Sequence, residues 1–133
     1  IYDSPMVRSD FIALLLEALD LEQVQVAGPL PETIASVALC GGSGSEFAEL
    51  ARDCGASVYL SSEVRHNVAR WAEESSFCII DGTHYATEKP AISLLVKRLG
   101  DFAYEQGWEL EVTESTSESP PFYTITNQSM NNP

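Results

Sequence analysis

The sequence predicts an α/β protein, in which a largely parallel β-sheet is sandwiched by helices within a single domain. Short apolar runs that end in glycine or polar turns alternate with amphipathic segments of about a dozen residues. Strands that are joined through helices of this length favour parallel pairing. The 133 residues suffice for one domain with its own core. No apolar run reaches the roughly 18 to 20 residues that a membrane-spanning helix needs.

The first expected element is a helix from Ser9 to Leu19, because apolar residues recur there at helical spacing. The strands expected along the chain lie in residues 23–28, 33–40, 57–60, 77–81 and 108–115. The helices expected between them lie in residues 46–53, 63–73 and 89–105. Residues 1–114 form the predicted domain. Residues 115–133 form a polar, proline-bearing segment, in which "FYTIT" adds an edge strand before a disordered end.

The charge balance restricts the classes of partner. Twenty acidic residues against seven basic residues give a net charge of −13. This charge repels phosphate backbones and anionic membrane surfaces, so neither a nucleic acid nor a membrane is an expected partner. It suits a soluble protein and the binding of divalent cations.

The cysteines and the first residue indicate the cellular compartment and the origin of the chain. Cys40, Cys54 and Cys78 are an odd number without CxxC spacing, so buried free thiols in a reducing cytoplasm are expected rather than a disulfide or a thiolate metal site. The chain begins at Ile1 rather than Met and lacks the pattern of a signal peptide. We therefore expect a cytoplasmic protein and a processed piece of a longer one.

The stretch "DGTHYATEK" follows an apolar strand and opens a helix. If the helix begins near Thr83, His84 and Glu88 stand one turn apart on one face and reach a common metal ion. Imidazole with carboxylate suits zinc, iron or manganese. The simpler interpretation is that His84 caps the junction and Glu88 is an exposed helix residue. In open α/β sheets, ligands bind beyond the carboxyl ends of the strands, where this stretch is expected to lie.

Two further junctions carry polar or glycine-rich residues. In "CGGSGSEF", the backbone of Gly41, Gly42, Ser43 and Gly44 can approach a ligand closely at the start of a helix, although a tight turn with a capping serine explains the same residues. The loop lacks the lysine of a P-loop and the spacing of a dinucleotide fingerprint, so nucleotide binding there is the least favoured hypothesis.

The third junction is "SSEVRHNVARW", with Glu63, Arg65 and His66. First-turn helix charges and a half-buried packing histidine account for these residues without any site. Three polar junctions at one edge of a sheet nevertheless indicate a common site.

Taken in order, "SVALCGGSGSEF", "GASVYLSSEVRHNVARWA" and "CIIDGTHYATEKPAISLLVKRL" resemble the C-terminal half of the Nif-three-like family. Its members are also called GTP cyclohydrolase 1 type 2 homologues. The resemblance runs from about Val37 to Leu99, and "SESPPF" is similar to an acidic-Pro-Phe stretch near the end of the family's chain. The glycine loop combined with "HYATE" at this spacing is the specific part of the pattern.

The resemblance implies an α/β fold in which two related halves build a site for two metal ions, and subunits that assemble into a toroidal homohexamer. It makes His84 and Glu88 metal ligands and places Glu63 and His66 at the border of the site as catalytic residues. The backbone of the "GGSG" loop then lines the pocket. The activity implied is hydrolysis by a metal-activated water.

Departures from the family pattern limit this expectation. The "HHP" stretch and the aspartate of the family's N-terminal half have no counterpart here, Asn67 replaces the second histidine, Thr83 replaces a glycine and "SSE" replaces "TGE". Two protein ligands are fewer than zinc sites use. The first hypothesis is therefore the C-terminal portion of a metal-dependent hydrolase, completed by a missing half or by other subunits. The second is a non-catalytic assembly or regulatory module that binds a small ligand.

Overall fold

The computed structural model describes residues 4–125. The chain divides into two compact units, Ile1–Leu95 and Val96–Pro133, and each is described by itself. The predicted domain boundary after residue 114 stays a prediction.

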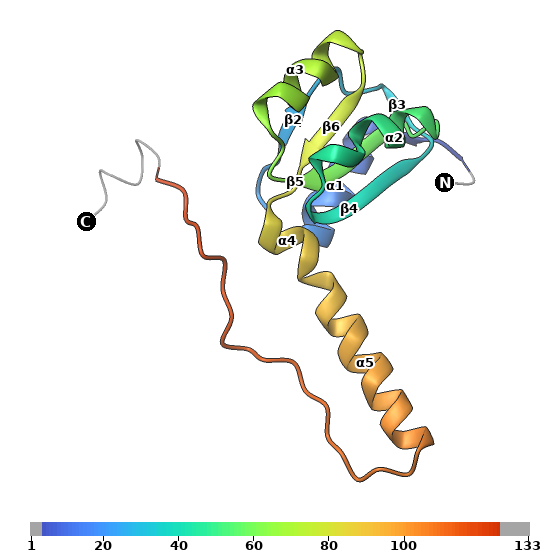
Figure 1. Ribbon diagram of the computed structural model, residues 1–133, viewed down its shortest axis with the longest axis vertical. Helices are drawn as coiled ribbons and strands as arrows, with labels where there is room; N and C mark the ends of the chain where they lie inside the picture. The colour runs from blue at the N-terminus through green and yellow to red at the C-terminus, as the bar shows by residue number, and fades with distance from the viewer. Residues whose placement is uncertain (1–3, 126–133) are drawn as a thin grey trace. The chain divides into compact units, whose positions relative to one another are not determined.

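A mostly parallel sheet organises the first unit (Figure 1). Its four strands, in the order β2-β6-β5-β4, are β2 (Gln25–Ala27), β6 (Cys78–Asp81), β5 (Val58–Ser62) and β4 (Val37–Ser43). The pairs β4 with β5 and β5 with β6 are parallel, whereas β2 pairs with β6 antiparallel. The short strands β1 (Met6–Val7) and β3 (Thr33–Ile34) form a separate antiparallel pair. The predicted α/β class with a largely parallel sheet is confirmed.

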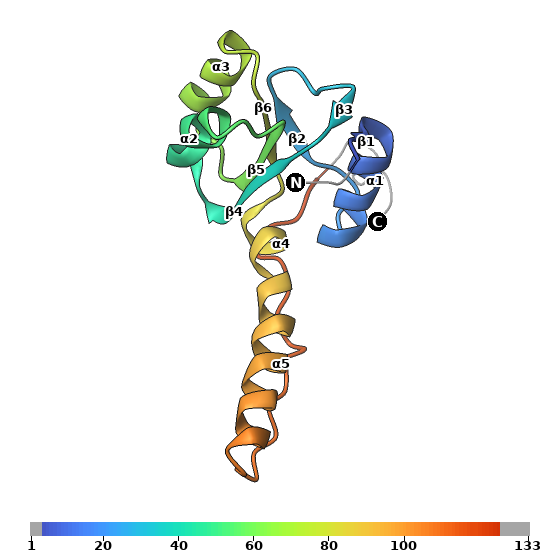
Figure 2. The ribbon, with the colours of Figure 1, turned by 90° about the vertical axis from the view of Figure 1, so that its right-hand side faces the viewer.

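Helices cover both faces of this sheet (Figure 2). The helix α1 (Arg8–Leu19) lies on one face, while α2 (Ala48–Asp53) and α3 (His66–Glu74) lie on the other. The 3₁₀ turn η1 (Ser45–Phe47) leads into α2. The short helix α4 (His84–Glu88) follows β6 and contacts β4 and β5, and α5 (Pro90–Glu105) comes next in the chain.

Alternating side chains along the central strands build two cores. Val58 of β5 and Ile80 of β6 pack with Phe11 of α1 on one side of the sheet. Tyr59 and Ile79 pack with the alanines of α2 and α3 on the other side. Because both faces are covered, the central strands begin with apolar residues on both faces, as parallel strands in α/β proteins do, and become polar only at their carboxyl ends. Packing on both faces thereby holds β4, β5 and β6 in place, and with them the positions of the strand ends.

Two expected elements differ from the structure within the first unit. The strand expected in residues 33–40 is split into β3 and β4, because the backbone N–H groups of Ala35 and Ser36 donate to the Ser57 hydroxyl rather than to the backbone of a neighbouring strand. The helix expected from Glu63 begins instead at His66, since Glu63 adopts a positive φ of 52° that α-helical backbone does not allow.

In the second unit, the expected strand over residues 108–115 is absent from the described residues. The Trp108 N–H donates to the Ala103 carbonyl, and Gly107 ends the helix with a φ of 68°. The alternation of "WELEVT" supplies strand propensity but not a partner strand, and pairing is what forms a strand. Residues 122–125 are likewise unpaired, and the last residue of "FYTIT" lies outside the described residues. No helix within residues 4–125 has the length and apolar character needed to cross a bilayer.

The three cysteines are free, as expected, but their burial differs: Cys54 is exposed, Cys40 is half-buried and Cys78 is buried. Burial raises the pKa of the Cys78 thiol to about 11.

At pH 8 only about one thousandth of the Cys78 thiol is then the reactive thiolate. We expect iodoacetamide at pH 8 to alkylate Cys54 rapidly and to leave Cys78 unmodified, as read by peptide mass spectrometry. Labelling in urea, where all three thiols react, is the control; equal native rates at Cys54 and Cys78 would contradict the packing of β6.

Candidate functional site

Three polar junctions meet at one edge of the sheet, as the sequence predicted. Since β4, β5 and β6 run parallel, their carboxyl ends lie together, and α4 packs against the ends of β4 and β5. This edge carries the glycine loop that ends β4, Glu63 after β5 and His84 after β6.

His84 is the centre of the side-chain group. Its Nδ1 lies 2.8 Å from Oε1 of Glu63, and its Nε2 lies 3.2 Å from Oε2 of Glu88. The second contact follows from the helical spacing of α4, which puts residues four apart on one face. The first contact joins residues 21 positions apart in the chain and requires the fold. The structure therefore brings together three of the predicted residues.

The electrostatics of this group favour a positive charge. The hydrogen bond with Glu63 raises the pKa of the His84 imidazole above its ordinary value, and the negative charge of Glu88 raises it further. All three side chains are partly exposed to solvent. With Nδ1 bonded to Glu63, a proton on Nε2 and a metal ion are alternative partners for Nε2 and Glu88.

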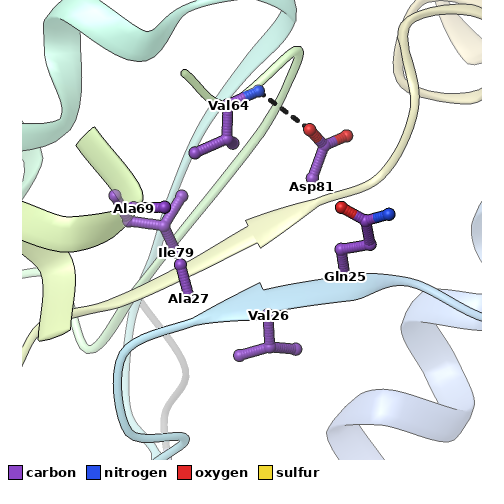
Figure 3. Close-up of a pocket in the computed structure, with 7 residues that line it drawn as sticks. All are labelled: Gln25, Val26, Ala27, Val64, Ala69, Ile79 and Asp81. Carbon is purple, nitrogen blue, oxygen red and sulfur yellow. Dashed lines mark hydrogen bonds between the residues drawn. The ribbon is translucent and has the colours of Figure 1, made fainter. Parts of the chain in front are cut away.

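Asp81 fixes the distance between the two junctions. Its Oδ2 accepts a hydrogen bond from the Val64 N–H at 2.8 Å (Figure 3). Its Oδ1 accepts one from the Thr83 N–H at 3.0 Å. Val64 follows Glu63 and Thr83 precedes His84, so one carboxylate holds the backbone beside both. Sequence reasoning missed Asp81; the only signal was an acidic residue at the end of a buried strand.

A small hollow of about 130 Å³ borders on Asp81, and Figure 3 shows the residues that line it. Asp81 and Gln25 supply its polar lining, and the rest is apolar. Both Asp81 oxygens already accept backbone hydrogen bonds. Asp81 therefore acts as a structural anchor in this hollow.

The backbone is strained in both of the segments that Asp81 bonds. Glu63 has a φ of 52°, and Thr83 has a φ of 63° with a ψ of 149°. The conformation of Thr83 lies in a region that is essentially restricted to glycine, and a β-branched side chain makes it costly. The sequence signal for this strain was the threonine at a position where the family pattern has glycine.

The glycine loop packs against the His84 group. A side chain on Gly42, which has a φ of 68°, would collide with Oε1 of Glu88 and would lie 3.2 Å from Nε2 of His84. The Gly42 N–H donates to Oγ1 of Thr87, and the Gly42 carbonyl accepts from the Ser61 hydroxyl. The need for glycine here is thus close approach to the candidate ligands. Thr87 was also missed by sequence reasoning.

The rest of the loop is similarly anchored. The Tyr59 hydroxyl donates to the Gly44 carbonyl at 2.7 Å, and a side chain on Gly41 would meet the Thr87 carbonyl. Ser43 ends β4 opposite Ser62 of β5. A ligand-binding role for Gly41, Gly42, Ser43 and Gly44 stays a prediction.

His66 lies apart from the His84 group in its interactions. It is the first residue of α3, is exposed, and its side chain forms no hydrogen bond or ion pair within the described residues. Its predicted catalytic role stays a prediction. Its neighbour Arg65 has its N–H bonded to the Ser45 hydroxyl, which in turn donates to the Glu63 carbonyl.

The residues of this group fit a metal ion in part. Ligands about 2.0 to 2.2 Å from zinc at tetrahedral angles are about 3.3 to 3.5 Å apart, and the 3.2 Å between His84 Nε2 and Glu88 Oε2 is close to that separation. Within residues 4–125, however, no three or more His, Cys, Asp or Glu side chains are arranged to hold a metal ion. The described chain thus offers a pair of ligands rather than a full set.

The fold and the edge of polar junctions define an α/β protein with a candidate metal-binding edge. The model of the family described as Duf34/NIF3 (NGG1p interacting factor 3) matches residues 2–121. The chain therefore belongs to the Duf34/NIF3 family.

Named relatives and solved structures agree with this assignment. A Streptomyces coelicolor protein named GTP cyclohydrolase 1 type 2 homolog is 30% identical over 100 residues, which are 74% of this chain and 35% of the relative. A Nostoc protein of the same name is 34% identical over 94 residues, 64% of this chain and 36% of the relative. The crystal structure of Staphylococcus aureus protein SA1388 is similar with a TM-score of 0.84 at 27% identity, over 93% of this chain and 40% of that one. The chain spans about a third of the length of these two named relatives.

The strained Thr83 gives a testable prediction about stability. We expect Thr83→Gly to raise the free energy of unfolding by about 1 kcal/mol, because the relief of backbone strain exceeds the extra chain entropy that glycine loses. Urea unfolding followed by circular dichroism measures this change. Thr33→Gly, at an exposed strand position with negative φ, is the matched control and should lower stability instead. Destabilisation by Thr83→Gly of the same size as by Thr33→Gly would show that the Thr83 conformation carries no strain.

Proposed function

We propose that this chain supplies His84 and Glu88 as two protein ligands of a divalent metal site, and that the complete site catalyses a hydrolytic reaction. Glu63 acts in this proposal as the residue that positions His84. Imidazole with carboxylate suits zinc, iron or manganese. The name shared by the relatives, GTP cyclohydrolase 1 type 2 homolog, is compatible with hydrolysis but identifies no substrate for this chain.

The observation that carries the proposal is the pair of contacts at the two nitrogens of His84. A histidine that binds a metal usually donates its other ring N–H to a carboxylate, which fixes the tautomer and the orientation of the ring. With the proton on Nδ1 donated to Glu63 at 2.8 Å, the lone pair of Nε2 faces the side where Glu88 lies. Glu63, His84 and Glu88 thus have the pattern of a positioning carboxylate, a metal ligand and a second ligand.

A divalent ion, when bound, lowers the pKa of a coordinated water and polarises a substrate oxygen. The chain's own residues prepare the place for it: Asp81 sets the separation of the two junctions, and Gly42 leaves room beside Glu88. The net charge of −13 attracts cations to the protein. These features support a cation site at this edge of the sheet.

Two ligands do not complete a catalytic site, which usually has three protein ligands and an open position. We propose that the remaining ligands come from a part of the family's chain that this sequence does not span, on the same polypeptide or on another subunit of a homo-oligomer. A two-metal site formed in this way is the fullest form of the proposal.

The second candidate function is a non-catalytic assembly or ligand-binding module. It is favoured by one observation, namely that the described residues include no group of three metal-binding side chains. In this alternative the His84 group is an ion-pair network that holds the loops.

The proposal predicts a specific loss of metal. We expect His84→Ala and Glu88→Ala each to lower the metal content of the purified chain at least about tenfold, because each removes one of two ligands. Elemental analysis of the desalted protein, loaded with equimolar zinc or manganese, gives the measurement. His66→Ala is the matched control, since it removes the other histidine and should leave the metal content unchanged. Equal metal content in all three variants, with folding intact by circular dichroism, would remove the basis of the metal site.

The role of Glu63 is tested separately. We expect Glu63→Ala to weaken metal binding by about 10- to 100-fold, the usual effect of losing the carboxylate that orients a histidine ligand. Glu63→Gln keeps the acceptor oxygen and should weaken it less. Competition with a metallochromic indicator measures both affinities, with Glu74→Ala on the exposed surface of α3 as the control. Wild-type affinity in Glu63→Ala would mean that Glu63 does not orient His84.

Because a proton on His84 excludes the metal, metal binding to the native chain should also weaken as pH falls through the raised pKa of His84.

A further inference from the structure

A second hollow lies between the helices on one face of the sheet, and nothing in the proposed metal site uses it. Its volume is about 350 Å³, within the range of pockets that hold small organic ligands. One wall comes from η1 and α2, and the other comes from the start and middle of α3. The lining residues are Ser45, Glu46, Ala48, Glu49, Arg65, Asn67, Val68 and Trp71.

The two walls carry opposite charge. Glu46 and Glu49 face the pocket from the side of η1 and α2, one helical turn apart, whereas Arg65 faces it from the start of α3. The ion pair between Arg65 and Glu46 is loose, at 3.7 Å, and both side chains are more than half exposed. Such an exposed pair is easily opened by a competing ligand. The pocket is therefore bipolar, with one negative wall and one positive wall.

Polar groups remain available on each wall. Within the described residues, the Glu49 carboxylate and the Asn67 amide form no hydrogen bond or ion pair, although both line the pocket. Glu49 is an acceptor for an ammonium group, and Asn67 can donate to a carboxylate beside Arg65. The Arg65 backbone is held in place by the Ser45 hydroxyl, so the positive wall has a fixed base.

The base of the pocket is apolar. Ala48 is buried, and the side chains of Val68 and Trp71 are half-buried within the same cluster. The Arg52 guanidinium lies over the Trp71 ring at 5.1 Å, and Phe77 meets the ring edge to face, so two neighbouring side chains position the indole. An aromatic wall beside Val68 suits an aliphatic or aromatic side chain of a ligand.

We propose that this pocket binds a zwitterionic α-amino acid with an apolar side chain. The ammonium group contacts Glu49, the carboxylate contacts Arg65 and Asn67, and the side chain packs on Val68 and Trp71. An ammonium, a carboxylate and an apolar group on one small molecule match the negative wall, the positive wall and the base. The proposal is independent of metal binding at His84, because it uses none of the candidate ligands.

Titration calorimetry of the full chain with L-leucine tests the proposal. We expect binding with a Kd of about 1 mM or tighter. Two analogues separate the charges: isoamylamine lacks the carboxylate, and 4-methylpentanoate lacks the ammonium group. Each should bind about tenfold more weakly than leucine, since each loses a charge-assisted hydrogen bond. Glycine, which lacks the apolar side chain, should also bind more weakly.

Variants then place the site. Glu49→Gln and Arg65→Gln should each weaken leucine binding about tenfold. The matched controls on α3 are Glu74→Gln and Arg70→Gln, which make the same changes of charge outside the pocket and should leave the Kd unchanged. No heat of binding at 10 mM leucine, equal affinity for isoamylamine, or unchanged binding in Glu49→Gln would each overturn the proposal. Retained metal content in Glu49→Gln would show that such a failure concerns this pocket alone.

Discussion

The site geometry depends on the carboxylate of Asp81. In the parallel register of β5 and β6, Ser61 lies opposite Asp81, and the chain leaves both strands within two residues of that pair. One carboxylate then bonds the backbone of both departing segments, at Val64 and at Thr83. The Gly82 N–H also donates to the Ser61 carbonyl at 2.9 Å, and the Glu63 and His84 side chains contact each other directly, so the two segments are joined from the strand ends to the candidate residues. The separation of the candidate residues is thus set by a buried strand register.

The glycine loop adds a second constraint from the neighbouring strand. Ser61 and Tyr59 of β5 donate their hydroxyls to the carbonyls of Gly42 and Gly44, which holds the end of β4 against β5. Thr87 accepts the Gly42 N–H and so ties the same loop to α4. Three consecutive parallel strands therefore contribute to one rigid edge. This close packing explains why position 42 is a glycine, and the explanation does not involve phosphate binding.

The central strands and most helices were predictable from the sequence because their signals are local. The runs around Val58 and Ile80 begin with apolar residues on both faces, as strands covered on both faces do, and the α5 pattern repeats at helical spacing. The pairing of His84 with Glu88 was predictable for the same reason. Asp81 and Thr87 were not, because their roles depend on tertiary register that one chain pattern does not contain. The segment after Trp108 shows the converse: its alternation is a local signal, but a strand also needs a partner.

The backbone conformation of the edge costs folding free energy, and the proposed metal site offers a reason for this cost. Ion pairs between half-exposed side chains, such as those of His84, contribute little to stability. Positive φ at two residues other than glycine, Glu63 and Thr83, costs about 1 to 3 kcal/mol each. Strain of this size persists only where surrounding packing imposes it, and such positions cluster at ligand sites and active sites. The balance between weak surface ion pairs and a strained backbone is therefore unfavourable for folding alone. In the proposed function, the bound ion offsets this cost, because a ligand that binds only the folded form stabilises it.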